Sequence, residues 1–195
     1  MLGNGELVVC DRQGATLLIV DPQTGNREII SSRDVGTGPS FKRPVSVSVT
    51  EAQQIVVLDT ASDPFLLKVD PQSGNRTPLS GSTIGEGPLP SLSQGRENFP
   101  DPDMEYDPIG GKILVADPIA PAVWLVDPEN GNREALLSGE VAQGPKLLKP
   151  QAVAADTDGL FVLSRVGPNL LRVDKRTGNR SMVSGPKKGL GPLPE

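Results

Sequence analysis

The sequence predicts an all-β repeat protein, because one short stretch occurs four times. Residues 20–27, 69–76 and 126–133 read VDPxxGNR, and residues 173–180 read VDKRTGNR. Asp followed by Pro, with Gly three positions after the Pro, is typical of a tight turn, since Pro fixes φ and Gly accepts a positive φ. The Asp residues of successive copies lie 49, 57 and 47 positions apart. This spacing is that of the blades of a β-propeller.

Strand-like runs flank each copy. A near-continuous apolar run comes before each turn, at residues 7–11, 55–59, 113–117 and 160–164. An alternating run enters the turn, and a short run leaves it at residues 28–31, 77–80, 134–138 and 181–184. A further run opens the second, third and fourth copies, at residues 44–49, 103–107 and 151–156. We therefore expect four-stranded antiparallel blades with strands A to D, except that the first blade lacks strand A.

Gly- and Pro-rich loops with a GxGP or GP element separate the copies, at residues 36–39, 85–88, 144–145 and 189–192. The expected units are a partial blade at 6–35, blades at 44–84, 101–139 and 150–185, and a C-terminal loop at 186–195. An open array of blades leaves unpaired strand edges. We therefore expect either a fragment of a larger propeller or a homodimer that completes a ring.

The strand that enters each turn divides its side chains between two faces. The residues expected to face the core are Leu18, Leu67, Trp124 and Leu171. Those expected mostly to face water are Ile19, Lys68, Leu125 and Arg172. The single Cys10 aligns with Leu58, Ala116 and Leu163, so it is expected to be a buried thiol.

Composition excludes several classes of function. The net charge is −5 and the basic residues are dispersed, which argues against nucleic acid and anionic membrane surfaces as partners. No apolar run is long enough to span a membrane. Residues 1–6 do not form a signal peptide, so we expect either a cytoplasmic protein or a chain whose front is missing. The absence of histidine removes the commonest general base.

The repeat resembles a known family at its third copy, where residues 113–117 read ILVAD and residues 126–128 read VDP. It looks like the NHL-type repeat of six-bladed, TolB-like bacterial propellers, and the resemblance covers essentially the whole chain. It implies a propeller fold and a parent protein that is commonly extracellular or periplasmic. This scaffold hosts enzymes and binding modules alike, so function must be argued from sites. Because the chain has no histidine, it departs from the streptogramin lyases, which are His-dependent propeller enzymes.

The repeated Asp and Arg of the turns allow two interpretations, a binding row or a structural turn. We favour the structural one, in which Asp and Arg pair across each hairpin. The residues concerned are Asp21, Arg27, Asp70, Arg76, Asp127, Arg133, Asp174 and Arg180.

Residues 101–107 are the one local departure from the repeat, because they carry carboxylates where other blades have small residues. Met104 and Tyr106 take the core-facing register, so Asp103 and Glu105 should point into the channel at the propeller axis. One hypothesis is that Asp103 and Glu105, with Asp101, bind a divalent cation such as Ca²⁺. The alternative, which we favour, is that these carboxylates are surrounded by water or paired with a basic side chain. The candidate partners are Arg43, Arg96 and Lys149.

We expect a non-catalytic binding scaffold without a cofactor. Its partner, a protein or a small ligand, would contact the face formed by the D-to-A loops and by B-to-C loops such as residues 59–64 and 117–121. The alternative function is a metal-dependent lactonase-like hydrolase centred on Asp103 and Glu105. Gluconolactonase-like enzymes also place carboxylates at a propeller axis, but the other blades here offer no matching Asn or Asp ligands in strand A.

Overall fold

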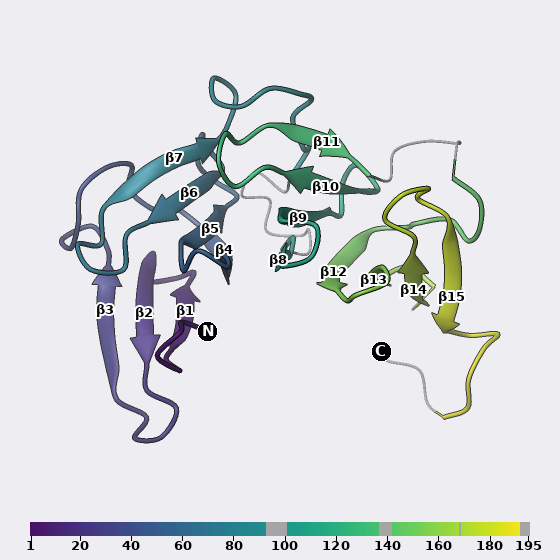
Figure 1. Cartoon of the computed structure of the whole chain (residues 1–195), viewed down its shortest axis with the longest axis horizontal. Helices are drawn as coiled ribbons and strands as arrows, with labels where there is room; N and C mark the ends of the chain where they lie inside the picture. Colours follow the sequence, from purple (N-terminus) through teal and green to yellow (C-terminus); the bar gives the residue numbers. More distant parts are fainter. Residues whose placement is uncertain (93–100, 137–141, 168, 192–195) are drawn as a thin grey trace. The chain divides into compact units, whose positions relative to one another are not determined.

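The computed structural model describes residues 1–92, 101–136, 142–167 and 169–191. Within these ranges the chain forms fifteen β-strands and no helix (Figure 1). The described residues therefore include no helix that could cross a membrane. The strands fall where the sequence predicts them, because alternation and turn chemistry are local properties of the chain.

The strands form four antiparallel sheets, in each of which neighbours in sequence are neighbours in space. The first sheet has three strands, β1 (Leu7–Asp11), β2 (Thr16–Val20) and β3 (Arg27–Ser31). The second contains β4 (Pro44–Val49), β5 (Ile55–Asp59), β6 (Leu66–Val69) and β7 (Arg76–Ser80). The predicted partial first blade is thus present without an inner strand.

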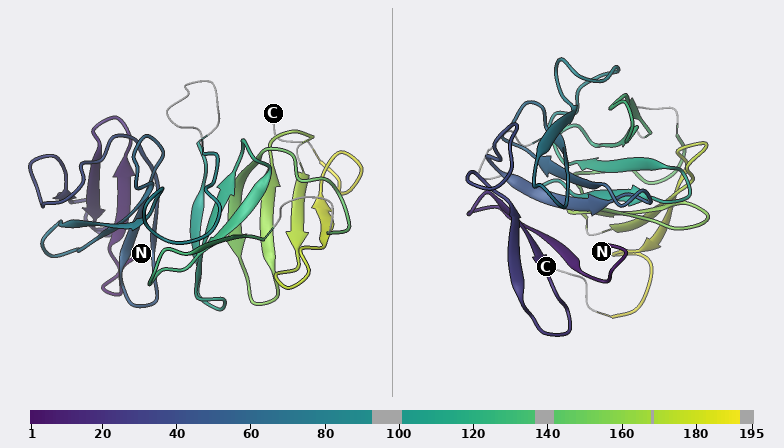
Figure 2. Two further views of the ribbon diagram at one scale, coloured as in Figure 1. Left: turned by 90° about the horizontal axis from the view of Figure 1, so that it is seen from above. Right: turned by 60° about the vertical axis from the view of Figure 1, so that its left-hand side comes forward.

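The third sheet contains β8 (Met104–Asp107), β9 (Lys112–Asp117), β10 (Ala122–Val126) and β11 (Arg133–Ala135). The fourth contains β12 (Pro150–Ala155), β13 (Leu160–Ser164), β14 (Asn169–Val173) and β15 (Arg180–Ser184), which lie side by side in Figure 2. The strand predicted at residues 134–138 ends at Ser138, which lies outside the described residues, as do Arg96 and residues 192–195.

The chain divides into two compact units. The first contains residues 1–89 and 127–132, and its core includes Leu17, Ile55, Val57 and Leu67, so that β1–β3 packs against β4–β7. The second contains residues 90–126 and 133–195, and its core includes Leu114, Val123, Val162 and Leu171, so that β8–β11 packs against β12–β15.

The predicted core register holds for Leu67, Trp124 and Leu171, which are all buried. In β2 it differs, because Leu17 is fully buried while Leu18 is only half-buried. The face of β2 that carries Leu17 packs against the second sheet. Cys10 is half-buried rather than fully buried, and burial raises the pKa of its thiol.

Candidate functional site

The aspartates of the four repeated turns organise the turns themselves. A carboxylate oxygen of Asp70 accepts hydrogen bonds from the N–H groups of Gln72 (3.0 Å) and Ser73 (2.7 Å) and from the Ser73 hydroxyl (2.8 Å). Asp21, Asp127 and Asp174 accept equivalent backbone bonds two residues on. Because these bonds favour the ionised form, the pKa values of Asp21, Asp70 and Asp174 lie below the usual value.

Two arginines of the turns, Arg76 and Arg180, make contacts other than the expected pairing with the Asp of their own turn. Arg76 does not close its own hairpin but donates to the preceding sheet's loop, to the carbonyl oxygens of Pro39 (2.6 Å), Ser32 (2.8 Å) and Val35 (3.0 Å). It also donates to the Ser31 hydroxyl (2.6 Å). Arg180 likewise donates to the carbonyl oxygens of Pro145 (2.7 Å) and Ala142 (2.9 Å). These arginines therefore join consecutive sheets.

The acidic residues of the third sheet bond to the backbone of the fourth. A carboxylate oxygen of Asp103 accepts a hydrogen bond from the N–H of Val153 (3.2 Å), and Glu105 accepts one from the N–H of Ala155. Burial, with smaller contributions from the charges of Asp103 and Asp107, raises the pKa of Glu105. Asp101 lies before β8 and is half-buried. No group of three or more potential metal ligands occurs in the part of the chain that the structure describes.

Lys175 is a structural residue that sequence reasoning missed. It occupies the position of Pro22, Pro71 and Pro128 in the other turns. Its ammonium lies 2.7 Å from a carboxylate oxygen of the buried Asp107 and donates to the carbonyl oxygen of Asp156 (3.0 Å). Burial alone would raise the pKa of Asp107, but Lys175 and two backbone N–H groups lower it below the usual value. The signal in the sequence was the change from VDP to VDK.

Two fully buried aspartates, Asp59 at the end of β5 and Asp117 at the end of β9, were also missed by sequence reasoning. Asp59 accepts hydrogen bonds from the N–H groups of Lys42 (2.6 Å), Arg43 (3.0 Å) and Ala61 (3.1 Å). Each of these aspartates thus ties the loop after its strand to the loop that enters its own blade. The signal was the recurring Asp at the end of the apolar run.

Asp117 holds the loop between β9 and β10 in the same way. Its carboxylate accepts hydrogen bonds from the N–H groups of Ile119 (3.0 Å) and Ala120 (3.0 Å), and from that of Ser91 (2.6 Å). The indole N–H of Trp124 also donates to it, at 3.2 Å. The loop is therefore fixed from several sides by one buried carboxylate.

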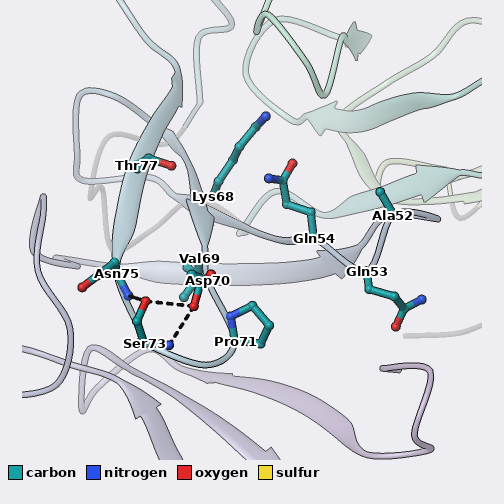
Figure 3. Close-up of a pocket in the computed structure, with 10 residues that line it drawn as sticks. All are labelled: Ala52, Gln53, Gln54, Lys68, Val69, Asp70, Pro71, Ser73, Asn75 and Thr77. Carbon is teal, nitrogen blue, oxygen red and sulfur yellow. Dashed lines mark hydrogen bonds between the residues drawn. The ribbon is translucent and has the colours of Figure 1, made fainter.

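A polar pocket of about 590 Å³ lies at the hairpin end of the second sheet (Figure 3). Its lining includes Gln53, Gln54, Lys68, Asp70, Asn75 and Thr77. Asp70 is already bonded within its turn, and Gln53 accepts a hydrogen bond from the N–H of Gly3. A smaller pocket of about 310 Å³ recurs at the corresponding place in the first sheet, beside Asp21. We therefore attribute both hollows to the geometry of the repeat.

An apolar pocket of about 320 Å³, here called the loop pocket, lies at the opposite end of the strands in the second unit. Its lining residues are Pro118, Ile119, Pro121, Leu148, Lys149 and Val166. They come from the β9–β10 loop, from the segment before β12 and from the β13–β14 loop. These are the kinds of loop that the sequence predicts to form a binding face.

No protein-family model and no curated protein matches the chain. Solved structures do match it. A chain of a nidogen–laminin complex has a TM-score of 0.62 and 10% identity, over 95% of this chain and 63% of that one. A catalytically inactive histidine-to-alanine variant of virginiamycin B lyase from Staphylococcus aureus has a TM-score of 0.63 and 10% identity, over 93% and 52%.

An auxiliary nutrient binding protein from Bacteroides ovatus has a TM-score of 0.65 and 11% identity, over 93% of this chain and 45% of that one. The chain thus spans between about half and two-thirds of the length of these structures. Identities this low indicate the fold alone. The predicted fold class is confirmed, and the four sheets are blades of a β-propeller.

Proposed function

We propose that this chain is a non-catalytic binding scaffold of NHL-type blades, whose loop pocket receives an apolar segment of a partner protein. The observation that carries the proposal is the apolar lining of this pocket. Leu148 and Val166 expose 41% and 43% of their surface there. Covering such side chains removes apolar surface from water, which favours association at about 25 cal/mol per Å² before the costs of ordering.

The pocket is pre-organised by the hydrogen bonds that hold its three segments. Asp117 fixes the β9–β10 loop through Ile119 and Ala120. The Ser164 hydroxyl donates a hydrogen bond to the carbonyl oxygen of Leu148. The N–H of Arg165 donates to the carbonyl oxygen of Lys149, at 3.1 Å. A binding surface that is already ordered loses little conformational freedom when a partner docks.

Lys149 indicates the chemistry of the partner, since it is the one charged side chain among the described residues of the lining. A segment with an aliphatic or proline side chain beside a carboxylate would satisfy both the apolar walls and this ammonium. The chain has no histidine, and the lyase among the structural neighbours is inactive as a histidine-to-alanine variant. This supports a binding role over lyase chemistry.

The test uses a set of synthetic pentapeptides that carry Leu or Pro beside Glu, with alanine-only peptides as controls. Trp124 is the only tryptophan and donates to the carboxylate that holds the pocket loop, so its fluorescence should report binding. Val166→Asp should abolish binding, whereas Ile109→Asp, at a 59% exposed position of the β8–β9 turn, should leave it unchanged. The proposal fails if no acidic apolar peptide binds, or if both variants behave alike.

The second candidate function is the metal-dependent hydrolase centred on Asp103 and Glu105, with Asp101. The observation in its favour is that Asp103 and Glu105 both bond to the backbone of β12, at Val153 and Ala155, so their carboxylates lie along the same strand. Burial is the main cause of the raised pKa of Glu105, and the charge of Asp103 adds to it, so a cation beside both groups would favour their ionised forms. A site of this kind must raise the melting temperature when Ca²⁺ is added and lower it with EDTA. Unchanged melting in both conditions excludes it.

A further inference from the structure

Within each compact unit, the two blades are joined by one repeated contact, between a GNR tip and a docking loop. The GNR tips are residues 25–27, 74–76, 131–133 and 178–180, and a docking loop is the segment that follows the last strand of the preceding blade. At the first junction, the N–H of Thr37 donates to the side-chain oxygen of Asn75 (2.8 Å), and the N–H of Arg76 donates to the carbonyl of Thr37 (2.8 Å). Gln143 exchanges the same two bonds with Asn179 (2.9 Å) and Arg180 (2.8 Å).

A glycine and a serine of the preceding blade complete the contact. A Cβ atom at Gly38 would lie 2.0 Å from the carbonyl oxygen of Arg76, so only glycine fits there. The Ser31 hydroxyl donates to the carbonyl of Gly74 (2.7 Å), and the Ser80 hydroxyl donates to that of Gly131 (2.8 Å). The contact therefore requires the same residue types each time it forms.

The first GNR tip has the same sequence as the others, and none of the described docking loops contacts it. The Arg27 side chain is exposed and forms no hydrogen bond or ion pair with any described residue, whereas Arg76 is 4% exposed. A Cβ atom at Gly25 would meet nothing within 4 Å, while one at Gly74 would lie 2.0 Å from the carbonyl oxygen of Ile30. The same side of the blade exposes 40% of Leu7 and 41% of Val9. Their counterparts in β5, Ile55 and Val57, are fully buried.

The last docking loop has the shape of the others, and none of the described GNR tips contacts it. Gly189 and Gly191 have φ values of 99° and 109°, in the same positive region as Gly36 (78°) and Gly38 (95°). A Cβ atom at Gly191 would meet nothing within 4 Å.

The side chains around this last loop are exposed as well. Leu190, between the two glycines, is fully exposed, and Val183 exposes 37% of its surface. Ile30 and Leu79, the counterparts of Val183 in β3 and β7, are buried. Ser184 takes the place of Ser31 and Ser80 and is itself exposed. The chain thus presents both halves of its own blade junction.

We propose that the first GNR tip of one chain binds the last docking loop of a second copy, head to tail. Asn26 accepts a hydrogen bond from the N–H of Leu190, and the N–H of Arg27 donates to the Leu190 carbonyl, as in the junctions within the chain. The Arg27 guanidinium reaches Ser184. Leu7 and Val9 are covered by the exposed apolar side chains of the last blade, Leu163 and Val183.

We expect the ring to contain two copies of the four described blades. A contact between two different surfaces of the same chain forms a ring when its rotation closes. Two chains supply eight blades, which is the upper end of the usual range for propellers, and three would exceed that range. The proposed dimer contact involves none of the residues that line the loop pocket, and it does not depend on the peptide that the pocket would bind.

The test measures the mass of the full chain by light scattering over a range of concentrations. The expected result is a species of twice 20.5 kDa. Arg27→Ala and Ser184→Trp, both at exposed positions, should each weaken the dimer at least tenfold. Arg176→Ala removes the same charge from an exposed turn position and should change the dissociation constant less than twofold. Thermal melting checks that all the variants are folded.

Mixing the Arg27→Ala and Ser184→Trp chains distinguishes a head-to-tail contact from any symmetric one. The mixed dimer contains one unaltered tip–loop contact, so it should form at concentrations where each variant alone is monomeric. A monomeric parent chain at every concentration would overturn the proposal. So would a dimer insensitive to Arg27→Ala, a mixture no tighter than its components, or polymers that grow without limit.

Discussion

The first two VDPxxGNR turns have nearly the same sequence and very different surroundings. Residues 20–27 and 69–76 differ only at Thr24 and Ser73. Both turns have the same internal bonds, since the N–H of Gly25 donates to the carbonyl of Asp21 (2.8 Å) and that of Gly74 to the carbonyl of Asp70 (2.9 Å). Yet Arg27 is exposed and Arg76 is buried in the preceding loop. The turn sequence thus determines the hairpin, while the neighbouring blade determines how much the hairpin contributes to stability.

The largest effect is expected from alanine substitutions at these two arginines. Arg76→Ala leaves three carbonyl oxygens and the Ser31 hydroxyl without their donor, and should lower the free energy of unfolding by about 3 kcal/mol. Arg27→Ala, studied at a concentration where the chain is monomeric, should change it by less than about 0.5 kcal/mol. Urea denaturation of both variants measures the difference. Equal effects would show that the junction does not stabilise the fold.

The second comparison concerns two glycines of the docking loops. Gly38→Ala combines a positive φ with a clash against the Arg76 carbonyl, whereas Gly191→Ala meets open space and only the unfavourable φ. We expect Gly191→Ala to cost about 1 kcal/mol and Gly38→Ala about 2 kcal/mol more. Thermal unfolding of the monomeric variants checks this order, and a reversed order would contradict the contact described at Gly38.

A smaller effect is expected from Lys175→Met, which removes the partner of the buried Asp107. We expect a loss of about 1 to 2 kcal/mol at neutral pH, because a buried carboxylate loses a charge-assisted hydrogen bond. Lys68→Met is the control, since Lys68 lines the polar pocket and carries the same side chain. The loss should diminish at low pH, because the stabilisation from a lowered Asp107 pKa is itself lost as that group protonates.

The smallest effect concerns Glu105. Because burial raises its pKa, the folded protein binds this proton more tightly than the unfolded chain does. The contribution of Glu105 to stability is therefore fully present below the usual pKa near 4.5 and is lost as the pH rises through the raised value. Glu105→Gln keeps an acceptor for the N–H of Ala155 and should be more stable than the parent at pH 7. Their unfolding free energies should converge at acid pH, and a constant difference would contradict the raised pKa.

The fold could be predicted because the features that define it are local. The VDPxxGNR turns and the flanking apolar runs set the strands and most of their register without reference to distant residues. The one register error, at Leu17 and Leu18, arose because the first blade packs against another blade of its unit on one face only. A repeat pattern describes an average blade and does not show that the two faces of one blade are packed differently.

The contacts of the candidate site could be predicted only in part. The bonds within each turn follow from Asp and Gly, but Arg76 bonds to Ser31 and Pro39, which lie in the preceding blade. The available signal for this contact between blades was that each GxGP or GP element is followed, one blade later, by a GNR sequence. Asp103 and Glu105 bond to β12, a partner that no spacing indicates. Whether they also hold a cation remains a prediction for the calcium melting experiment.

The second GNR tip is bound by a docking loop of its own chain, whereas the first is bound only in the proposed dimer. Amide hydrogen exchange of Arg27 and Arg76 distinguishes the two tips when it is measured in dilute and in concentrated solutions of the unmodified chain. We expect the Arg76 amide, bonded to the Thr37 carbonyl, to be protected in both. The Arg27 amide should be protected only where the dimer forms, together with that of Leu190. Equal protection of the two arginines in dilute solution, or an unprotected Arg27 in the dimer, would show that the docking loop is not what distinguishes the two tips.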